Sequence, residues 1–200
     1  MGAQVIPTKG NLLKIKKSLE LAQVGYELMD KKRNILIREI MLLIDKANEL
    51  QNEIDTAYNE AYTALQTANI TLGFCRDISM SVPEENGLSL DLRSVMGVEL
   101  PIVSIECEKT PILHYGLGST NSALDNAYKE FLDVKLLTVE LAEIENSIYR
   151  LATEIKKTQK RANALGNIII PRFKEQIAFI SDALEEKERE EFSRLKLLKK

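Results

Sequence analysis

Few side chains in this sequence have the types and spacing that catalysis requires. His114 is the single histidine, and Cys75 and Cys107 are the two cysteines. No glycine-rich phosphate loop opens a helical pattern, and no serine or cysteine stands in a nucleophile motif. Two unpatterned cysteines favour neither a disulfide framework nor a zinc site, so we expect reduced thiols. We therefore predict that this chain has no catalytic residue, no cofactor and no metal.

The charged residues are numerous, but their arrangement is typical of helix surfaces. Near the end of the sequence, Lys187 and Arg189 interleave with Glu185, Glu186, Glu188, Glu190 and Glu191. The formal net charge of −3 gives no general attraction to nucleic acid or to anionic lipid. The sequence contains no apolar run long enough to cross a membrane and no secretory leader pattern. We expect a cytoplasmic protein with no nucleic-acid partner and no direct membrane insertion.

Two apolar heptad stripes indicate the elements that carry these side chains. The first stripe follows Leu12, Ile15, Leu19, Ala22, Tyr26, Met29, Arg33, Leu36, Ile40, Leu43, Ala47, Leu50, Ile54, Ala57, Ala61, Ala64, Ala68 and Thr71. The second follows Ala127, Phe131, Val134, Leu137, Leu141, Ile144, Ile148, Leu151, Ile155, Thr158, Ala162, Leu165, Ile169, Phe173, Ile177, Ile180 and Leu184. Sixteen of the eighteen positions on the first stripe are apolar, where a composition of 44% hydrophobic residues gives about eight by chance.

The stripes predict a mainly α fold, in which the N- and C-terminal helices form a long antiparallel two-helix coiled coil with a short β-hairpin in the middle. We expect a single elongated domain, 1–200, with helices over 9–72 and 121–198 and an insertion over 73–120. Thr8 follows Pro7 and is suited to cap the first helix. A helix of such length would extend about 90 Å. The alanines late in the first stripe bury little area, so we expect that end to lean on another element.

The insertion carries the pattern of a hairpin. Residues 88–93 and 102–107 alternate like half-buried strands, with Met96 and Gly97 between them. We expect a β-hairpin with a loop wider than two residues. Pro101 is one of the prolines and glycines that punctuate this insertion. An isolated hairpin is marginal in water, and this one must therefore pack on the helices or on a partner.

The second helix contains a proline that should bend it. Pro171 removes the hydrogen bond to the carbonyl of Asn167, and the core spacing becomes four, four, four from Leu165 to Ile177. Gly166 adds flexibility five residues earlier. The spacing alone is compatible with a tolerated kink or with a helix pair that must be curved near its end.

Basic residues gather where the two helices begin and finish. Antiparallel pairing would bring eight of them to one tip: Lys9, Lys14, Lys16, Lys17, Arg194, Lys196, Lys199 and Lys200. They are either ordinary solubilising ends or a basic tip that enters a complementary socket. Arg33 is the one charge on the first stripe, and a buried guanidinium there needs partners or a route to the surface.

Several blocks resemble the D subunit of the V-type and archaeal-type rotary ATPases. They are Pro7–Leu19, Gly25–Arg33, Ser94–Pro101, Lys160–Leu165, Ile170–Pro171 and Leu184–Lys196. Each block alone is moderately specific, but their order and separation cover nearly the whole chain.

The resemblance implies a central rotor shaft whose tip enters a hexamer of alternating catalytic and non-catalytic subunits. It implies two further partners, a small globular F subunit near the hairpin and a funnel-shaped subunit that couples the base to the membrane ring. It also implies that Pro171 makes the shaft asymmetric, so that one rotor imposes three states on three like sites. The chain would be peripheral to the membrane through this complex.

Two other classes share the architecture. A prefoldin-like chaperone combines a coiled coil with a hairpin but presents apolar residues at its distal tips, where this sequence presents lysines. A membrane-curving helical dimer would need a basic face along the helices, and the charges here are mixed along most of their length.

Overall fold

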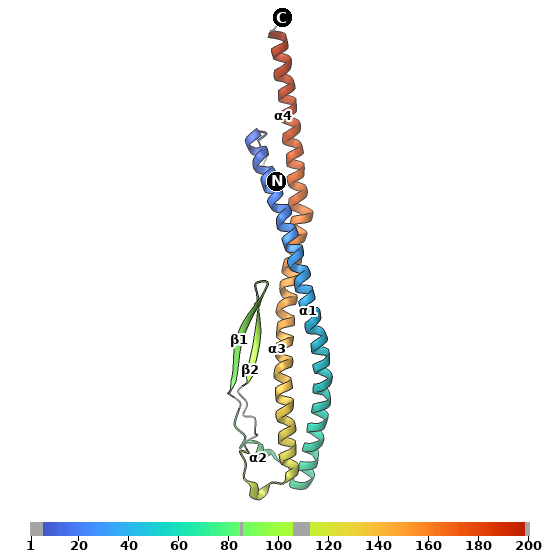
Figure 1. Ribbon diagram of the computed structural model, residues 1–200, viewed down its shortest axis with the longest axis vertical. Helices are drawn as coiled ribbons and strands as arrows, with labels where there is room; N and C mark the ends of the chain where they lie inside the picture. The colour runs from blue at the N-terminus through green and yellow to red at the C-terminus, as the bar shows by residue number, and fades with distance from the viewer. Residues whose placement is uncertain (1–5, 85, 106–112, 199–200) are drawn as a thin grey trace. The chain divides into compact units, whose positions relative to one another are not determined.

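The computed structural model describes residues 6–84, 86–105 and 113–198, in two compact units. Unit 1 is formed by Met1–Leu36 and Ile155–Lys200, and unit 2 by Ile37–Glu154. Helices α1 (Lys9–Leu72) and α3 (Ser122–Ala164) each contribute to both units. The predicted mainly α fold, with paired terminal helices and a central hairpin, is confirmed (Figure 1).

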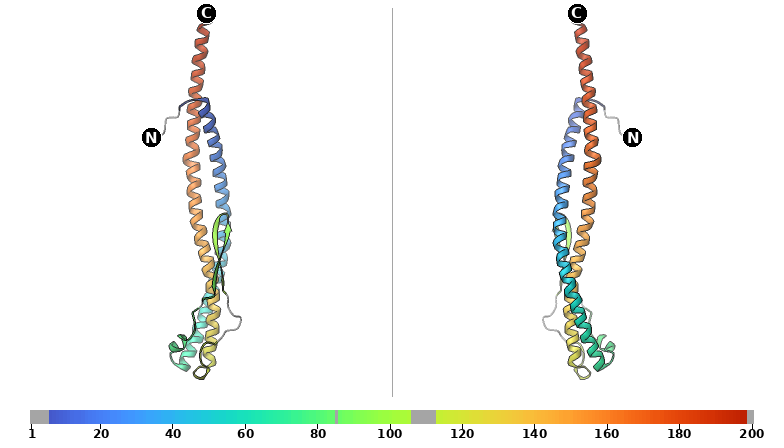
Figure 2. Two further views of the ribbon diagram at one scale, coloured as in Figure 1. Left: turned by 90° about the vertical axis from the view of Figure 1, so that its left-hand side faces the viewer. Right: turned by 90° about the vertical axis from the view of Figure 1, so that its right-hand side faces the viewer.

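In unit 1, the beginning of α1 lies antiparallel to α4 (Ile170–Leu198), and α4 continues past the first turn of α1 (Figure 2). The predicted cap is confirmed, because the Asn11 amide donates to Thr8 Oγ1 at 3.2 Å. The buried residues of this unit all belong to the two heptad stripes: Ala22, Leu36, Thr158, Ala162 and Ile180. No buried side-chain nitrogen or oxygen in the described residues lacks a hydrogen-bond partner.

In unit 2, the second half of α1 packs against the first half of α3. Leu50, Ile54, Ala61 and Ala68 of α1 are buried, and all four lie on the predicted stripe. Where α1 is rich in alanine, aromatic rings fill the remaining space. Tyr62 stacks on Tyr58 with ring centroids 5.9 Å apart and meets Phe131 of α3 edge-on at 5.6 Å. The alanine-rich end therefore gains support from large neighbouring side chains.

The turn between α1 and α3 begins and ends with residues suited to helix termini. Gly73 follows α1 with a φ of +83°, a left-handed conformation that glycine adopts without strain. At the start of α3, Asn121 Oδ1 accepts a hydrogen bond from the Leu124 amide at 3.1 Å. The Asn121 side chain also donates to Thr71 Oγ1 at 2.7 Å, which ties the two helix ends together. Between them lie the short α2 (Arg76–Ser79) and the 3₁₀ turn η1 (Leu117–Ser119).

The hairpin is formed by antiparallel strands β1 (Leu88–Val95) and β2 (Val98–Ile105), paired from Val95↔Val98 to Leu88↔Ile105. The predicted loop wider than two residues is wrong. Met96 and Gly97 have φ values of 51° and 78°, so a two-residue turn joins longer strands. The expectation failed because the strands extend beyond the alternating runs, to Val95 and Val98, and because methionine rarely adopts the left-handed conformation that this turn requires. Cys107, at the end of the second predicted strand, lies outside the described residues.

Candidate functional site

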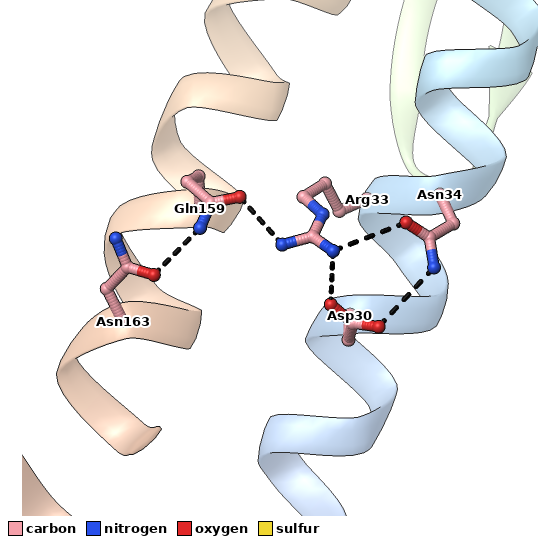
Figure 3. A network of polar contacts seen from close by, with 5 residues as sticks. All are labelled: Asp30, Arg33, Asn34, Gln159 and Asn163. Atoms are coloured by element: carbon pink, nitrogen blue, oxygen red, sulfur yellow. Dashed lines mark hydrogen bonds and ion pairs between the residues drawn. The ribbon is translucent and has the colours of Figure 1, made fainter. Parts of the chain in front are cut away.

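Arg33, the one charged residue on the first stripe, forms a network between α1 and α3 in unit 1. The Arg33 guanidinium donates to Gln159 Oε1 at 2.8 Å and forms an ion pair with Asp30 (Figure 3). Asn34 bridges Arg33 and Asp30, and Gln159 donates to Asn163 Oδ1 at 2.7 Å. The Arg33 side chain is 25% exposed, so the charge has both partners and partial access to water. Because the network is specific to one pairing of α1 with α3, it favours a single register of the helices.

The predicted bend contains a π-helical segment, η2 (Leu165–Ile169), directly before α4. The Ile170 amide donates to the carbonyl of Leu165, five residues earlier. This extra residue in the turn accommodates the spacing change that the sequence showed, and it precedes Pro171, whose ring an α-helical turn would crowd. The bend itself stays a prediction.

Gly166 has a packing role that the sequence did not reveal. A Cβ atom built on Gly166 would lie 3.0 Å from Cε2 of the Tyr26 ring, which is closer than side chains normally tolerate. The glycine therefore permits a close approach between η2 and α1 within unit 1. Only the position of the facing aromatic ring explains the residue, and that position depends on how the helices pair.

At the predicted tip, some of the basic residues are neutralised. Lys9 Nζ lies 2.9 Å from Glu188 Oε1, and this contact raises the pKa of Lys9 above its usual value. Arg194 pairs with Glu190 at 3.8 Å, one turn away on α4. Lys14, Lys16, Lys17 and Lys196 are exposed, whereas Lys199 and Lys200 lie outside the described residues.

The basic residues at the start of α1 and those at the end of α4 lie toward the same end of unit 1, but at different positions along the axis of the helix pair. Because Lys9 faces Glu188, Lys17 and Lys196 lie eight residues from that level in opposite directions. At 1.5 Å per residue they are separated by about 24 Å along the helix pair. Apolar side chains accompany them on α4, where Phe192, Leu195, Leu197 and Leu198 are 63–84% exposed. The tip is therefore amphipathic, with lysines and large apolar groups together.

The hairpin is anchored to α3 along the outer edge of β2. In a hairpin closed by Val95↔Val98, the backbone groups of Glu99, Pro101 and Val103 point away from β1. The Val103 amide donates to Glu143 Oε2 at 2.7 Å, and Arg150 donates to the Glu99 carbonyl at 3.0 Å. Pro101 lies between them and loses no ladder hydrogen bond at this position.

This arrangement explains a buried residue that lies off the predicted stripe. Ser147 is 3% exposed, and it stands four residues after Glu143 and three before Arg150. Residues with this spacing share one face of a helix, so Ser147 lies on the same face as the two residues that bind β2. The strand β2 runs beside α3 (Figure 1). A small side chain there suits a strand lying directly against the helix.

The turn end of unit 2 presents an apolar surface that sequence reasoning missed. A cavity of about 380 Å³ is lined by Leu65, Cys75, Ile78, Ser79, Val82, Tyr115, Leu124, Ala127, Tyr128 and Phe131. The thiol of Cys75 is free and half-buried. Beside the cavity, Ile70, Phe74, Met80 and Leu117 are 70–98% exposed. The sequence does contain a signal for this surface, because several large apolar residues stand among the glycines and prolines of the turn.

Tyr115 holds the wall of this cavity in place. Its hydroxyl donates to Asp125 Oδ1 at 2.8 Å, and its ring meets Tyr128 edge-on at 5.9 Å. Burial raises the pKa of Tyr115, and the neighbouring Asp125 carboxylate adds to the effect. The ionised phenolate is disfavoured because it would lose the hydrogen bond and face a negative charge.

The surfaces described above contain no constellation that suggests a reaction. Within residues 6–84, 86–105 and 113–198, no three histidine, cysteine, aspartate or glutamate side chains converge to hold a metal ion. The same residues include no helix long and apolar enough to cross a membrane.

Comparison with known proteins shows the family of the chain. The family model for the ATP synthase D subunit matches residues 11–200. The chain belongs to the ATP synthase D-subunit family. It is 48% identical to the D subunit of the V-type ATP synthase of Thermotoga neapolitana, over 98% of this chain and 97% of that protein. It is 39% identical to the D subunit of the A-type ATP synthase of Pyrococcus furiosus, over 98% of this chain and 94% of that protein.

A third relative, the A-type D subunit of Methanosphaera stadtmanae, is 38% identical over 97% of this chain and 92% of that protein. The family comprises stalk subunits of rotary ATPases that are not themselves catalytic. This chain is therefore a central-stalk subunit, as the sequence blocks indicated, and the comparisons give no support to the chaperone alternative.

Proposed function

We propose that this chain transmits torque between the ATP-hydrolysing hexamer and the membrane ring of a proton- or sodium-translocating rotary ATPase. The observation that carries the proposal is the match to the D-subunit family over nearly the whole chain. The continuous 64-residue helix α1 supports it, because an unbroken hydrogen-bonded helix resists twisting better than segments joined by loops. The complex would hold the chain at the cytoplasmic side of the membrane as a peripheral subunit.

The catalytic and non-catalytic subunits of the hexamer are proposed to surround the tip of unit 1. The exposed Phe192, Leu195 and Leu197 would lie in a socket that removes them from water, and Lys196 would meet acidic groups at its wall. A chaperone would present apolar residues at its tip, and the tip of unit 1 presents apolar residues as well as lysines. The chemistry of the tip therefore does not distinguish a stalk from a chaperone. Family membership makes that distinction instead.

Unit 2 offers one surface for each of the other two proposed partners. On the hairpin, Leu88, Leu90 and Leu92 share one face and are 52–60% exposed, and the outer edge of β1 has no strand beside it among the described residues. This surface suits the small globular F subunit. The exposed apolar residues at the turn, Ile70, Phe74 and Met80, suit the funnel-shaped subunit of the membrane ring.

The proposal is tested by reconstituting the complex and observing rotation of single molecules during ATP hydrolysis. Replacing Lys196, Lys199 and Lys200 with glutamate is expected to weaken insertion into the hexamer while leaving binding of the F subunit unchanged. Insertion and F-subunit binding are measured separately by co-purification and by titration of labelled protein. Equal loss of both contacts would contradict a role specific to the tip.

A further inference from the structure

Two short stretches of unit 1 gather an unusual amount of positive charge. Residues 30–33 of α1 and 156–161 of α3 contain seven cations, Lys31, Lys32, Arg33, Lys156, Lys157, Lys160 and Arg161, which we call the basic collar. Asp30 is their one carboxylate, so these ten residues carry a formal charge of +6 in a chain whose net charge is −3. Including the flanking Glu27 and Glu154 still leaves +4. The collar is therefore strongly basic in a mildly acidic protein.

The two stretches lie at one level of the helix pair. Arg33 donates to Gln159 Oε1 at 2.8 Å, and Gln159 stands immediately before Lys160 (Figure 3). Arg33 is occupied by this internal network and by Asp30, so it does not offer its charge to a partner. The remaining collar residues surround it on the outside of the pair.

Four collar residues are both exposed and uncompensated. Lys31, Lys156, Lys160 and Arg161 are exposed, and none of them has an ion pair with the residues that the structure describes. Several other cations, Lys9, Lys46, Arg189 and Arg194, each contact a glutamate. Concentrated and unpaired charge produces a strong local potential, which attracts an oppositely charged surface.

The four residues point in different directions around the pair. At 100° per residue, Lys31 lies opposite the α1 core positions Met29 and Arg33, facing away from α3. On α3, Lys156 and Lys160 face away from the core positions Thr158 and Ala162. Arg161 lies about 100° around the helix from Ala162, at the side of the helix pair. A flat membrane surface could meet only one of these sides. Charge on opposite sides suits a partner that encloses the helix pair.

We propose that the basic collar is a second contact site, enclosed by a carboxylate-lined opening in the hexamer and distinct from the tip. The inference rests on the proposed function, because the hexamer is the enclosing partner. Electrostatic complementarity of this kind mainly accelerates association and makes it sensitive to salt. The collar would draw the shaft into the opening and hold its axial position, while contacts at the tip are made deeper inside.

The test compares two charge changes of equal size in the full chain, assembled with the hexamer. The collar variant carries Lys156→Glu and Lys160→Glu. The control variant carries Arg38→Glu and Lys129→Glu, which are helical positions of unit 2 outside the proposed contact surfaces. Association rates are measured by stopped-flow fluorescence at low and at high salt. Circular dichroism and binding of the F subunit verify that both variants fold.

The collar variant is expected to associate about tenfold more slowly than the control at low salt, with the difference disappearing at high salt. Equal rates for the two variants, with normal assembly of the unmodified chain, would refute the collar and leave the proposed function intact. Failure of the unmodified chain to assemble would refute the proposed function itself. Collar-dependent binding to anionic vesicles or to DNA, with hexamer assembly unchanged, would assign the charge to another partner and overturn the inference.

Discussion

Unit 1 and unit 2 both contain a pair of helices from the two ends of the chain, but they bury very different amounts of side chain. Among the described residues, unit 1 has five buried positions and unit 2 has more than twice as many. Two helices alone can cover only one stripe on each other, whereas in unit 2 the hairpin covers a further face of α3. The free energy that holds unit 1 together is therefore smaller, and its stability depends more on the proposed partners.

The largest effect is expected from a cavity in unit 2. Leu151→Ala removes a side chain with 0% exposure and should lower the free energy of unfolding by about 3 kcal/mol. Leu136→Ala on the same helix, where the side chain is 43% exposed, serves as the matched control and should cost much less. Urea unfolding followed by circular dichroism measures both. Similar losses for the two variants would show that the buried Leu151 stabilises unit 2 no more than an exposed leucine does.

A smaller effect is expected at the close approach in unit 1. Gly166→Ala gains helix propensity but places a methyl group against the Tyr26 ring, so we expect a net loss of about 1 kcal/mol. In a Tyr26→Ala background the same change should become neutral or stabilising, because the obstructing ring is gone. A double-mutant cycle by urea unfolding measures this coupling. Additive effects would mean that Tyr26 is not the obstacle.

Ionisation of Tyr115, in unit 2, should make the stability of the chain depend on pH in the alkaline range. Because the pKa of Tyr115 is raised in the folded state, its stabilising contribution is present below the unfolded value of about 10 and is lost as the pH rises above it. Above about pH 9 the wild-type Tyr115 ionises more readily in the unfolded chain than in the folded chain. Tyr115→Phe removes this difference and should therefore change how stability depends on pH. With the raised folded pKa, the unfolded chain loses its proton first, so the wild-type chain should lose stability more steeply between about pH 9 and 11 than the variant.

Thermal unfolding across this range measures the difference. Tyr149→Phe, at a position 73% exposed, is the matched control and should leave the slope of the wild-type chain unchanged. Identical slopes for the two variants would contradict a raised pKa at Tyr115.

The smallest change in stability is expected at the polar network around Arg33 in unit 1. Arg33→Leu replaces the interhelical network with an apolar contact, and the pair should stay folded with a change of less than about 1 kcal/mol. Loss of register specificity is the accompanying expectation. Urea unfolding reports the stability, and disulfide trapping between cysteines introduced at alternative pairings reports the register. Unfolding of the variant would show that the network is required for folding.

Much of the fold could be predicted from the sequence because heptad spacing reports directly which helix face is buried. Each buried residue of α1 lies on the predicted stripe, from Ala22 to Ala68. On α3 the stripe missed Ser147, since the hairpin that covers it comes from a different part of the chain. The turn at Met96 was missed for a related reason. Its left-handed conformation is costly locally and is stabilised by strand pairing and by packing of β2 on α3.

The candidate site was less predictable than the fold. Composition identified basic residues at both ends, but only the pairing of Lys9 with Glu188 showed how far apart Lys17 and Lys196 lie. Likewise, the two stretches of the basic collar are distant in sequence and become one feature only through the contact of Arg33 with Gln159.

The sequence by itself determined that the chain forms two long helices with a hairpin between them and that it belongs to the D-subunit family, because periodicity and motif order are local properties of the chain. The tertiary structure alone decided why Gly166 is a glycine, why Ser147 is buried and which charges remain unpaired. Each of these depends on which side chain of another element comes within a few ångströms. That proximity is set by the packing of the helices and the hairpin, and no spacing within one segment encodes it.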